Sequence, residues 1–511
     1  MKHIILLVFF LIFYSEAFAK SFNLSEPIKV RANIENSSQA LRSYFSDRPE
    51  FTYFEDQSLG AASSVFLYGL DQRYVEIKLN GFNVIDSSTP LGVLNLSQIS
   101  GVSGLEVERF KASQAINLKT TSKNQKSKLL LKGSQLGEYG TNLSLVSKKM
   151  NFKVGASRAG GFNQTNIGSE KDWTEDQYAS LDYETNLGLL KSETSLFFSR
   201  QEQDYDSVFT GVQDAVGESD FFLVGNKIEI KDYKLHLSYS MSNRVFTEDD
   251  EINKFKGESF QTELFYKKWL SVLFFTESNN DLDDQSVKFE VRPYENLRTS
   301  LMWSNLRDYF LDIEWFLIKD FSLFYKEIPA SLFQINFDPE VELTPQRSIG
   351  LRFFQDFNIK DIDFRFDGLY QRAFDQIEFV VQDMAYQNFE RSEVVFASLM
   401  MSYKDYSLYA QGQRAKNLVQ DLDLPRRPRW VLGFDYQPSF KAVNIDLGLR
   451  WNSSLKAFDQ SRLSSFWTSR LDIEYKSFHF VVMNVLNQDK PIFRDFKRRP
   501  TTLELQYSYE F

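Results

Sequence analysis

The sequence predicts an all-β chain that forms one large antiparallel transmembrane β-barrel of about 22 strands. The first observation behind this prediction is that apolar and polar residues alternate along most of the chain after Lys128. The second is that the 511 residues include 49 Phe and 24 Tyr, although the mean hydropathy is only −0.36. The third is that long and short connections between these segments mostly alternate, as they do in the hairpins of membrane barrels.

The first residues predict export of the chain. Lys2 and His3 form a short basic start, Ile4 to Tyr14 is apolar, and Ala17-Phe18-Ala19 fits a small-x-small cleavage site. Because these are the parts of a secretory signal peptide, we expect residues 1–19 to be removed. An uncleaved anchor is the alternative, but the apolar run is too short to cross a bilayer as a helix.

The strand prediction rests on a period of two residues. In the clearest segment, Leu503 to Phe511, single polar residues separate the apolar ones. Val443 to Asn452 and Val287 to Arg292 alternate in the same way. Successive side chains of a strand point to opposite faces, so each strand has one apolar and one polar face. This suits a lipid-facing exterior and a wet lumen, although a β-sandwich, the alternative, would also alternate.

The connections support the barrel independently. The short ones include Lys231-Asp232, Lys267-Lys268, Lys319-Asp320 and Lys404-Asp405. The long ones are Gly160 to Gln177, Glu202 to Ser219, Arg244 to Lys256, Pro329 to Thr344, Phe374 to Glu390 and Ala415 to Pro428. We expect the long loops to lie outside the cell, and the short turns and both chain ends to lie in the periplasm.

Ahead of the barrel, Ala40 to Glu108 resembles the plug of TonB-dependent outer-membrane receptors. The matching stretches are SSVFLYGLDQRYVEIKLNGFNVID, Ser63 to Asp86, and LSQISGVSGLEVERF, Leu96 to Phe110. Gly69 and Gly81 keep the turn positions of the family, where the backbone needs a positive φ. The resemblance implies a small N-terminal plug domain, residues 34–122, inside the lumen of a barrel formed by residues 123–511.

Within that family, the chain resembles the cobalamin (vitamin B12) transporter branch. The matching stretches are Gly137 to Asn163, the Pro-Arg box Leu424 to Trp430, and Met483 to Asp489 before the final strand. The chain also departs from the pattern, because Tyr68 stands where the family has Arg and Asn80 where it has Asp. The glycine-rich end of the family's plug is replaced by Phe110 to Thr121, which contains no glycine. We therefore expect a shortened plug.

The N-terminal extension, residues 20–33, contains a segment that resembles the TonB box, EPIKVRA. Its residues are Glu26, Pro27, Ile28, Lys29, Val30, Arg31 and Ala32. The resemblance implies that the TonB complex of the inner membrane is a partner that pulls on this segment. A short β-prone tract near a chain end can add as a strand to the sheet of a partner. An ordinary leader without a partner is the alternative.

The resemblance implies a monomeric receptor in the bacterial outer membrane, in contact with its lipid, that takes up a scarce and bulky small-molecule ligand of the cobalamin or siderophore type. We expect ligand contacts at the plug apices that face outside: Glu55, Asp56, Gln57, Ser58, Asp86, Ser87, Ser88 and Thr89. The alternative is a degenerate receptor-like barrel that acts as a passive channel or a surface-binding protein.

An enzyme is not expected. The chain has no cysteine, which excludes thiol catalysis and thiolate metal sites, and its net charge of −10 argues against nucleic acid as a partner. His236-Leu237-Ser238 has the spacing of an outer-membrane phospholipase pair. The alternation turns both polar side chains into the lumen, however, away from any lipid substrate. A phospholipase is therefore a distant third alternative.

Charged loops offer further candidate sites. Carboxylate oxygens at Asp249, Asp250, Asp281 and Asp283 could bind calcium, as loops of the cobalamin branch do, and no other cofactor is expected. A solvated acidic loop is the alternative. Arg426, Arg427 and Arg429 could contact an anionic substrate or lipopolysaccharide, or could simply form the solvated base of a loop.

Overall fold

The computed structural model describes residues 29–33, 51–54, 64–67, 70, 75–89, 101–108, 114–120, 126–135, 137–160, 173–205, 215–248, 251–267, 270–280, 282–294, 297–318, 321–337, 343–380, 385–424, 427–456, 461–487 and 501–511. The signal peptide predicted for residues 1–19 lies outside these ranges. Within them, no helix is both long and apolar enough to span a bilayer.

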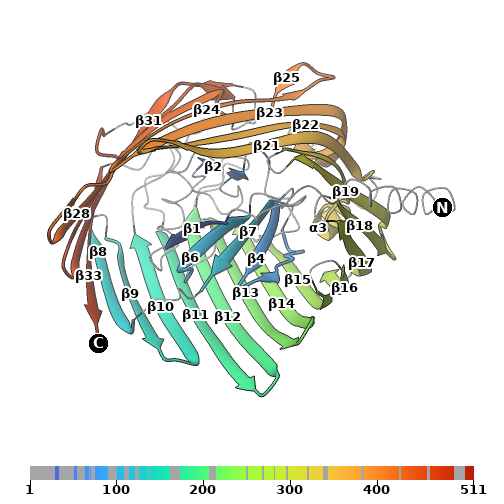
Figure 1. Ribbon diagram of the computed structural model, residues 1–511, viewed down its shortest axis with the longest axis horizontal. Helices are drawn as coiled ribbons and strands as arrows, with labels where there is room; N and C mark the ends of the chain where they lie inside the picture. The colour runs from blue at the N-terminus through green and yellow to red at the C-terminus, as the bar shows by residue number, and fades with distance from the viewer. Residues whose placement is uncertain are drawn as a thin grey trace.

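The wall of the molecule is a closed antiparallel barrel (Figure 1). In the described part of the chain it has 22 wall strands, which confirms the predicted fold. They are β8 (Lys128–Ser134), β9 (Tyr139–Val146), β10 (Met150–Gly160), β11 (Trp173–Leu187), β12 (Leu190–Tyr205), β13 (Ala215–Ile230), β14 (Tyr233–Glu248), β15 (Glu251–Tyr266), β16 (Leu270–Asn279), β17 (Leu282–Tyr294), β18 (Leu297–Ser304), β19 (Asp308–Ile318), β20 (Phe321–Ile328), β21 (Gln346–Ile359), β22 (Ile362–Val380), β23 (Ala385–Tyr403), β24 (Tyr406–Asn417), β26 (Trp430–Tyr436), β28 (Val443–Asn452), β31 (Phe466–Tyr475), β32 (Phe478–Met483) and β33 (Thr502–Glu510).

The last wall strand closes the barrel by pairing with the first, from Glu504 opposite Ser134 to Glu510 opposite Lys128. The short segment β25 (Leu422–Asp423) pairs with β24, and the short segment β27 (Ser439–Phe440) pairs with β28. In β33, Leu503 and Leu505 are exposed on the outside, while Glu504 is buried inside. The predicted division into an apolar outer face and a polar luminal face is therefore confirmed for this strand.

Two of the predicted short turns are observed as turns of two residues. Lys231 (φ 52°) and Asp232 join β13 to β14, and Lys404 (φ 51°) and Asp405 join β23 to β24. Lys267 also has a positive φ, of 54°. An even number of antiparallel strands returns the chain to its starting side, so both ends of the wall lie at the barrel end that carries these turns.

The prediction of a long loop from Arg244 to Lys256 is wrong. Strand β14 continues to Glu248 and pairs there with Glu251, the first residue of β15. Beyond the bilayer, both faces of a strand can meet water, so the apolar alternation ends although the backbone ladder continues. For the same reason, parts of the loops predicted at Glu202 to Ser219 and Phe374 to Glu390 are strand.

Inside the wall lies a smaller sheet with the order β1-β6-β7-β4-β5. Its strands are β1 (Lys29–Asn33), β6 (Gly104–Glu108), β7 (Gln114–Lys119), β4 (Val75–Leu79) and β5 (Phe82–Asn83). Strands β2 (Phe51–Phe54) and β3 (Ser64–Leu67) pair antiparallel in a separate two-stranded sheet. Figure 1 shows the five-stranded sheet within the ring of wall strands, alongside β11 to β14. We call these N-terminal elements the plug. Strand β1 belongs to the sheet although the predicted plug starts only at residue 34, and the exact domain boundaries stay a prediction.

The plug and the wall share one hydrophobic core. Plug residues Phe51, Leu79 and Leu105 are completely buried in the same cluster as Phe197 and Leu223 of the wall. Burial of side chains of this size contributes roughly 1.5–3 kcal/mol each. Apolar contact therefore holds the plug in the lumen, and the polar contacts described next decide where it sits.

Candidate functional site

The wall is lined by small side chains where the plug sheet rests. On β13 to β15 the buried luminal residues include Gly225, Ser238, Ser240, Ser242, Gly257 and Ser259. A Cβ atom at Gly225 would lie 2.6 Å from the ring of Phe82, and one at Gly257 would lie 2.7 Å from the backbone nitrogen of Ser88. These glycines are needed because the plug approaches the wall backbone directly. We call this part of the wall the plug seat.

One group of polar contacts holds the plug toward the short-turn end of the barrel. Asn80 adopts a positive φ of 52°, and its side-chain amide donates to Thr120 Oγ1 (2.7 Å) and Asp182 Oδ1 (2.9 Å). Thr120 Oγ1 in turn donates to Asp182 Oδ2 (2.6 Å), and Ser195 donates to Oδ1 of the same carboxylate (2.7 Å). The Asp182 carboxylate of β11 thus joins plug and wall. We call this group the Asp182 anchor.

Two wall lysines reinforce this anchor. Lys153 of β10 is completely buried and donates to Ser103 Oγ and to the Thr120 carbonyl of the plug. Lys227 of β13 donates to the Asn80 carbonyl and lies 4.8 Å from the ring centre of Phe82. Burying an ammonium group is costly unless it is paired, so these carbonyl and hydroxyl acceptors fix the plug relative to the wall.

A second group of contacts, the Arg244 anchor, holds the plug toward the opposite end. Arg244 of β14 forms an ion pair with Asp86 (3.1 Å) and donates through Nε to Ser88 Oγ (3.1 Å). Ser87 Oγ donates to the Ser278 carbonyl (2.5 Å), and Asn279 of β16 donates to the Ser87 carbonyl. The plug turn formed by Asp86, Ser87, Ser88 and Thr89 is therefore joined to the wall by a buried, charge-assisted network.

The predicted ligand contacts fall partly on this anchor. Asp86, Ser87, Ser88 and Thr89 are each at most 3 % exposed, because they are packed against the wall. Contact with a ligand would require this turn to leave its place first, so that role stays a prediction. Glu55, Asp56, Gln57 and Ser58 lie outside the described residues.

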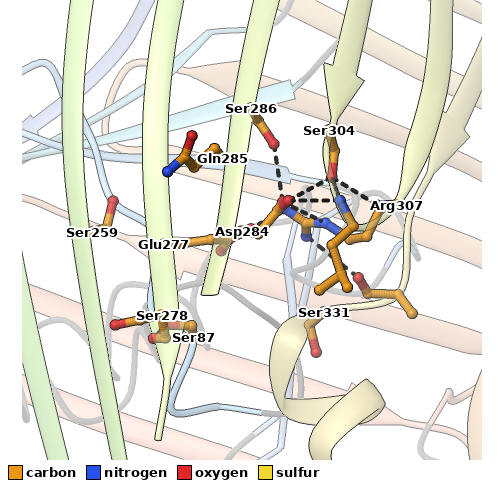
Figure 2. A network of polar contacts seen from close by, with 12 residues as sticks. Ser87, Ser259, Glu277, Ser278, Asp284, Gln285, Ser286, Ser304, Arg307 and Ser331 are labelled. Carbon is orange, nitrogen blue, oxygen red and sulfur yellow. Dashed lines mark hydrogen bonds and ion pairs between the residues drawn. The ribbon is translucent and has the colours of Figure 1, made fainter. Parts of the chain in front are cut away.

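Next to the Arg244 anchor lies the buried charged network drawn in Figure 2. Arg307, between β18 and β19, donates through Nε to Asp284 (2.9 Å) and also pairs with Glu277. Ser304 and Ser286 donate to Asp284 at 2.6 and 3.0 Å. Burial lowers the pKa of Arg307, but the two carboxylates outweigh it and raise the pKa above its ordinary value. Arg307 therefore stays charged and joins three neighbouring strands.

The same arginine reaches the predicted long loop between β20 and β21. Its Nη1 donates to the Ala330 carbonyl (3.4 Å), just before the short helix α3 (Leu332–Phe337). Ser331 caps this helix, because its hydroxyl accepts from the backbone N–H of Gln334 (3.2 Å) and the Gln334 side chain accepts from the backbone N–H of Ser331 (3.0 Å). Figure 2 shows α3 beside the network of Arg307. Ala330 and helix α3 of this loop thus lie against the wall.

Part of the predicted TonB box is described. Lys29 to Ala32 belong to β1, which pairs antiparallel with β6 from Lys29 opposite Glu108 to Asn33 opposite Gly104. Glu26, Pro27 and Ile28 lie outside the described residues. In the described sheet order β1 is an end strand, at the position where a further strand can add.

The phospholipase-like pair faces the lumen, as predicted. The ring of His236 lies 6.1 Å from that of Phe82 in the plug and 4.7 Å from that of Phe265 in the wall. Ser238 is buried on the same face. Both side chains are therefore turned away from the lipid that such an enzyme would need to reach.

The candidate calcium ligands are mostly untested by the structure. Asp249, Asp250 and Asp281 lie outside the described residues, and Asp283 is exposed. In the described ranges, no group of three or more acidic or histidine side chains is arranged to hold a metal ion. In the predicted arginine box, Arg427 lies 4.3 Å from the ring centre of Phe66 in the plug, and Arg429 pairs with Asp423 (3.1 Å).

Sequence reasoning missed the charged residues that hold the plug: Lys153, Asp182, Lys227 and Arg244. Each stands at a luminal position of an alternating segment, so its direction could have been read from the pattern. The partner of each residue could not be read from the pattern, because the partners lie far apart in the sequence; Asp86 and Arg244, for example, are 158 positions apart.

No protein-family model and no curated protein matches the chain. Its fold does match solved structures. The siderophore receptor PirA from Acinetobacter baumannii is 11 % identical, with a TM-score of 0.67, and the match covers 94 % of this chain and 98 % of that one. The ferric yersiniabactin uptake receptor FyuA from Yersinia pestis is 10 % identical, with a TM-score of 0.64, and the match covers 95 % of this chain and 98 % of that one. The copper transporter OprC is 13 % identical, with a TM-score of 0.62, and the match covers 96 % of this chain and 100 % of that one. At these identities, the likeness shows that the chain has the fold of these large barrels.

Proposed function

We propose that this protein is an outer-membrane receptor that binds a bulky ligand from outside and admits it when the plug is pulled from the periplasm. The observation that carries the proposal is a plug sheet fixed across the lumen by two polar anchors, one partly buried and one buried, on one side of the wall. A passive pore would need no such structure. The fold likeness to proteins named as a siderophore receptor, a ferric yersiniabactin uptake receptor and a copper transporter supports the same class of function.

The pulling partner that we propose is the TonB complex, acting on Lys29 to Ala32. A strand of the partner would add to β1 by backbone hydrogen bonding. Force on β1 would pass to β6 and then to β7, which are its successive neighbours in the sheet. Strand β6 begins directly after Ser103, and β7 ends directly before Thr120. Ser103 and Thr120 are the plug residues that Lys153 holds. The Asp182 anchor and Lys153 would thus be loaded early.

The ligand that we propose is a metal chelate or corrinoid of the siderophore or cobalamin type. Support for a chelate comes from the neighbours with the same fold, and support for cobalamin comes from the resemblance at both ends of the barrel. The passive channel or surface-binding protein remains the alternative, because the predicted loss of the glycine-rich plug end would weaken a regulated gate. Outer-membrane location and a monomeric state belong to the same proposal.

The experiment is an uptake assay with Lys29→Pro and Val30→Pro in cells that lack other receptors for cobalamin and ferric siderophores. Proline removes a backbone donor, so it should prevent strand addition to TonB. We expect concentrative uptake of the labelled ligand to stop while its binding to the cell surface is unchanged. A matched proline at Ser21, in the same predicted extension but before the box, should have no effect. Equal uptake with the box prolines, or in cells without TonB, would establish the passive alternative.

A further inference from the structure

Exposed lysines gather at the short turns of the barrel wall. In the described part of the wall, every residue other than glycine that adopts a positive φ at this end is a lysine. These residues, with φ between 51° and 58°, are Lys231, Lys267, Lys360, Lys404, Lys441 and Lys476. All of them are exposed, and so are Lys148 and Lys149 in the turn between β9 and β10. We call these eight residues the lysine collar.

Lysine is an unusual choice for these positions. A positive φ crowds the Cβ atom, so glycine, asparagine and aspartate are the residues that most often adopt it. The opposite end of the wall follows this rule. Its described residues with a positive φ, glycine apart, are Asn280, Asp375, Asp421, Asn484 and Asn487. Because asparagine would suit the backbone of the short turns better, the geometry of a turn does not explain the lysines, whereas a need for positive charge does.

The positive charge of the collar is not used within the protein. Among the described residues, no carboxylate forms an ion pair with a collar lysine. Asp232, Asp361 and Asp405 directly follow three of the lysines in the turns and are also exposed. The lysines outnumber these aspartates, so the short turns carry a net positive charge. The collar therefore presents cations whose partners must come from outside the chain.

The collar lies on the side of the wall that faces lipid. Three of its lysines hold their ammonium groups over the tyrosine ring that precedes them in the sequence. The distance to the ring centre is 5.4 Å at Lys267, 5.0 Å at Lys404 and 5.1 Å at Lys476. Tyr403 and Tyr475 are 38 % and 42 % exposed on the outer face of the barrel. Tyrosines at such strand ends mark the level where lipid chains give way to headgroups, so these ammonium groups lie at the headgroup level.

We propose that the lysine collar binds the anionic headgroups of phospholipids in the bilayer leaflet around the short-turn end. Each ammonium group has three donors on a flexible stem, which suits phosphate oxygens approached from any direction. Successive turns follow at every second strand, about 10 Å apart across the strands, so neighbouring headgroups meet separate lysines. These contacts hold this end of the barrel at a fixed depth. The proposal rests on the membrane location in the proposed function, but not on TonB or on the ligand.

The test measures lipid preference of the purified full-length protein in phosphatidylcholine liposomes. Electron paramagnetic resonance separates spin-labelled lipid held at the barrel from lipid in the bulk bilayer. We expect the wild-type protein to hold labelled phosphatidylglycerol, which is anionic, more strongly than labelled phosphatidylcholine. In a triple variant with Lys267→Asn, Lys404→Asn and Lys476→Asn, this preference should fall by about two-fold or more. Asparagine accepts a positive φ, so the turns should still form.

Two control variants separate the collar from charge in general. Arginine at the same three positions keeps the charge and should keep the preference. At the opposite end, a variant with Lys256→Asn, Arg347→Gln and Arg429→Gln loses the same number of charges from groups that already pair with carboxylates. It should also keep the preference. Heat-modifiable migration confirms that each variant is folded.

Three results would overturn the proposal. They are an equal preference in the wild-type protein and the asparagine variant, a loss of preference in the arginine variant, and a fall of the same size in the opposite-end variant. A folded wild-type protein that holds neither labelled lipid would contradict the membrane location itself, and with it the proposed function. Loss of lipid preference with unchanged ligand uptake would leave the proposed function intact and support the collar.

Discussion

The lumen wall differs between the plug seat on β13 to β15 and the sector formed by β17 to β21. The seat presents glycine and serine where the plug approaches most closely, and its long residues Lys227 and Arg244 reach from wall to plug. The other sector presents long charged side chains that pair with each other between wall strands. Arg298 pairs with Glu290, and Arg352 with Glu314 (3.6 Å). Side-chain size therefore decides where the plug can approach the wall, and charge decides how each sector is held together.

The largest expected effect comes from filling the seat. Gly225→Leu would place a side chain where the ring of Phe82 lies, so the plug should be displaced from the wall. Single-channel recordings in planar bilayers should then show large open pores that the wild-type protein lacks. Gly368→Leu on β22 is the matched control, because a Cβ there has no neighbour closer than 3.7 Å. If both variants, or neither, opened the pore, the seat would have no special role.

The next effect comes from breaking the Arg244 anchor. Arg244→Ala leaves the Asp86 carboxylate buried without its ion pair, which costs about 3–5 kcal/mol. We expect the plug turn to detach, so that a cysteine placed at Ser88 reacts with a thiol reagent in the variant but not in the otherwise wild-type chain. Arg200→Ala removes the half-exposed pair with Glu218 (3.3 Å), which is worth only about 0–1 kcal/mol, and should leave Ser88→Cys protected. Equal protection in the Arg244→Ala variant would show that the anchor does not hold the turn.

Loss of the cation in the network of Figure 2 should destabilise the wall and leave the plug in place. Arg307→Met leaves Glu277 and Asp284 buried without a cation, with a cost of the same order, about 3–5 kcal/mol. We expect the temperature of barrel unfolding, followed by heat-modifiable migration, to fall while Ser88→Cys remains protected. Exposure of Ser88→Cys in this variant would erase the distinction between the two sectors.

The smallest expected effect concerns calcium. If Asp249, Asp250, Asp281 and Asp283 bind it, millimolar calcium should raise the unfolding temperature slightly, and a chelator should reverse the shift, because a ligand that binds only the folded state stabilises it. Changing the four residues to asparagine should abolish the response. An unchanged unfolding temperature in the wild-type protein would leave solvated acidic loops as the explanation.

The wall could be predicted from the sequence because each strand carries its own signal. Leu503 to Phe511 needs no distant residue to show which face meets lipid. The signal fails at strand ends such as Glu248 and Glu251, where water on both faces removes the alternation. It also fails for the anchors, since Asn80 and Asp182 are 102 positions apart and nothing local to either names the other. Asn80, noted in the sequence only as a departure from the family pattern, proved to be a contact with the wall.

The central claim is that ligand uptake requires the plug to leave its seat. Because the chain has no native cysteine, Ser87→Cys and Ser242→Cys would form a unique pair, and the hydroxyls of both serines lie 2.7 Å from the same point, the Cβ position of Gly257. Oxidation of this pair should stop concentrative uptake of labelled cobalamin or ferric siderophore without reducing surface binding, and reduction should restore it. Uptake at an undiminished rate by the oxidised protein would contradict the account.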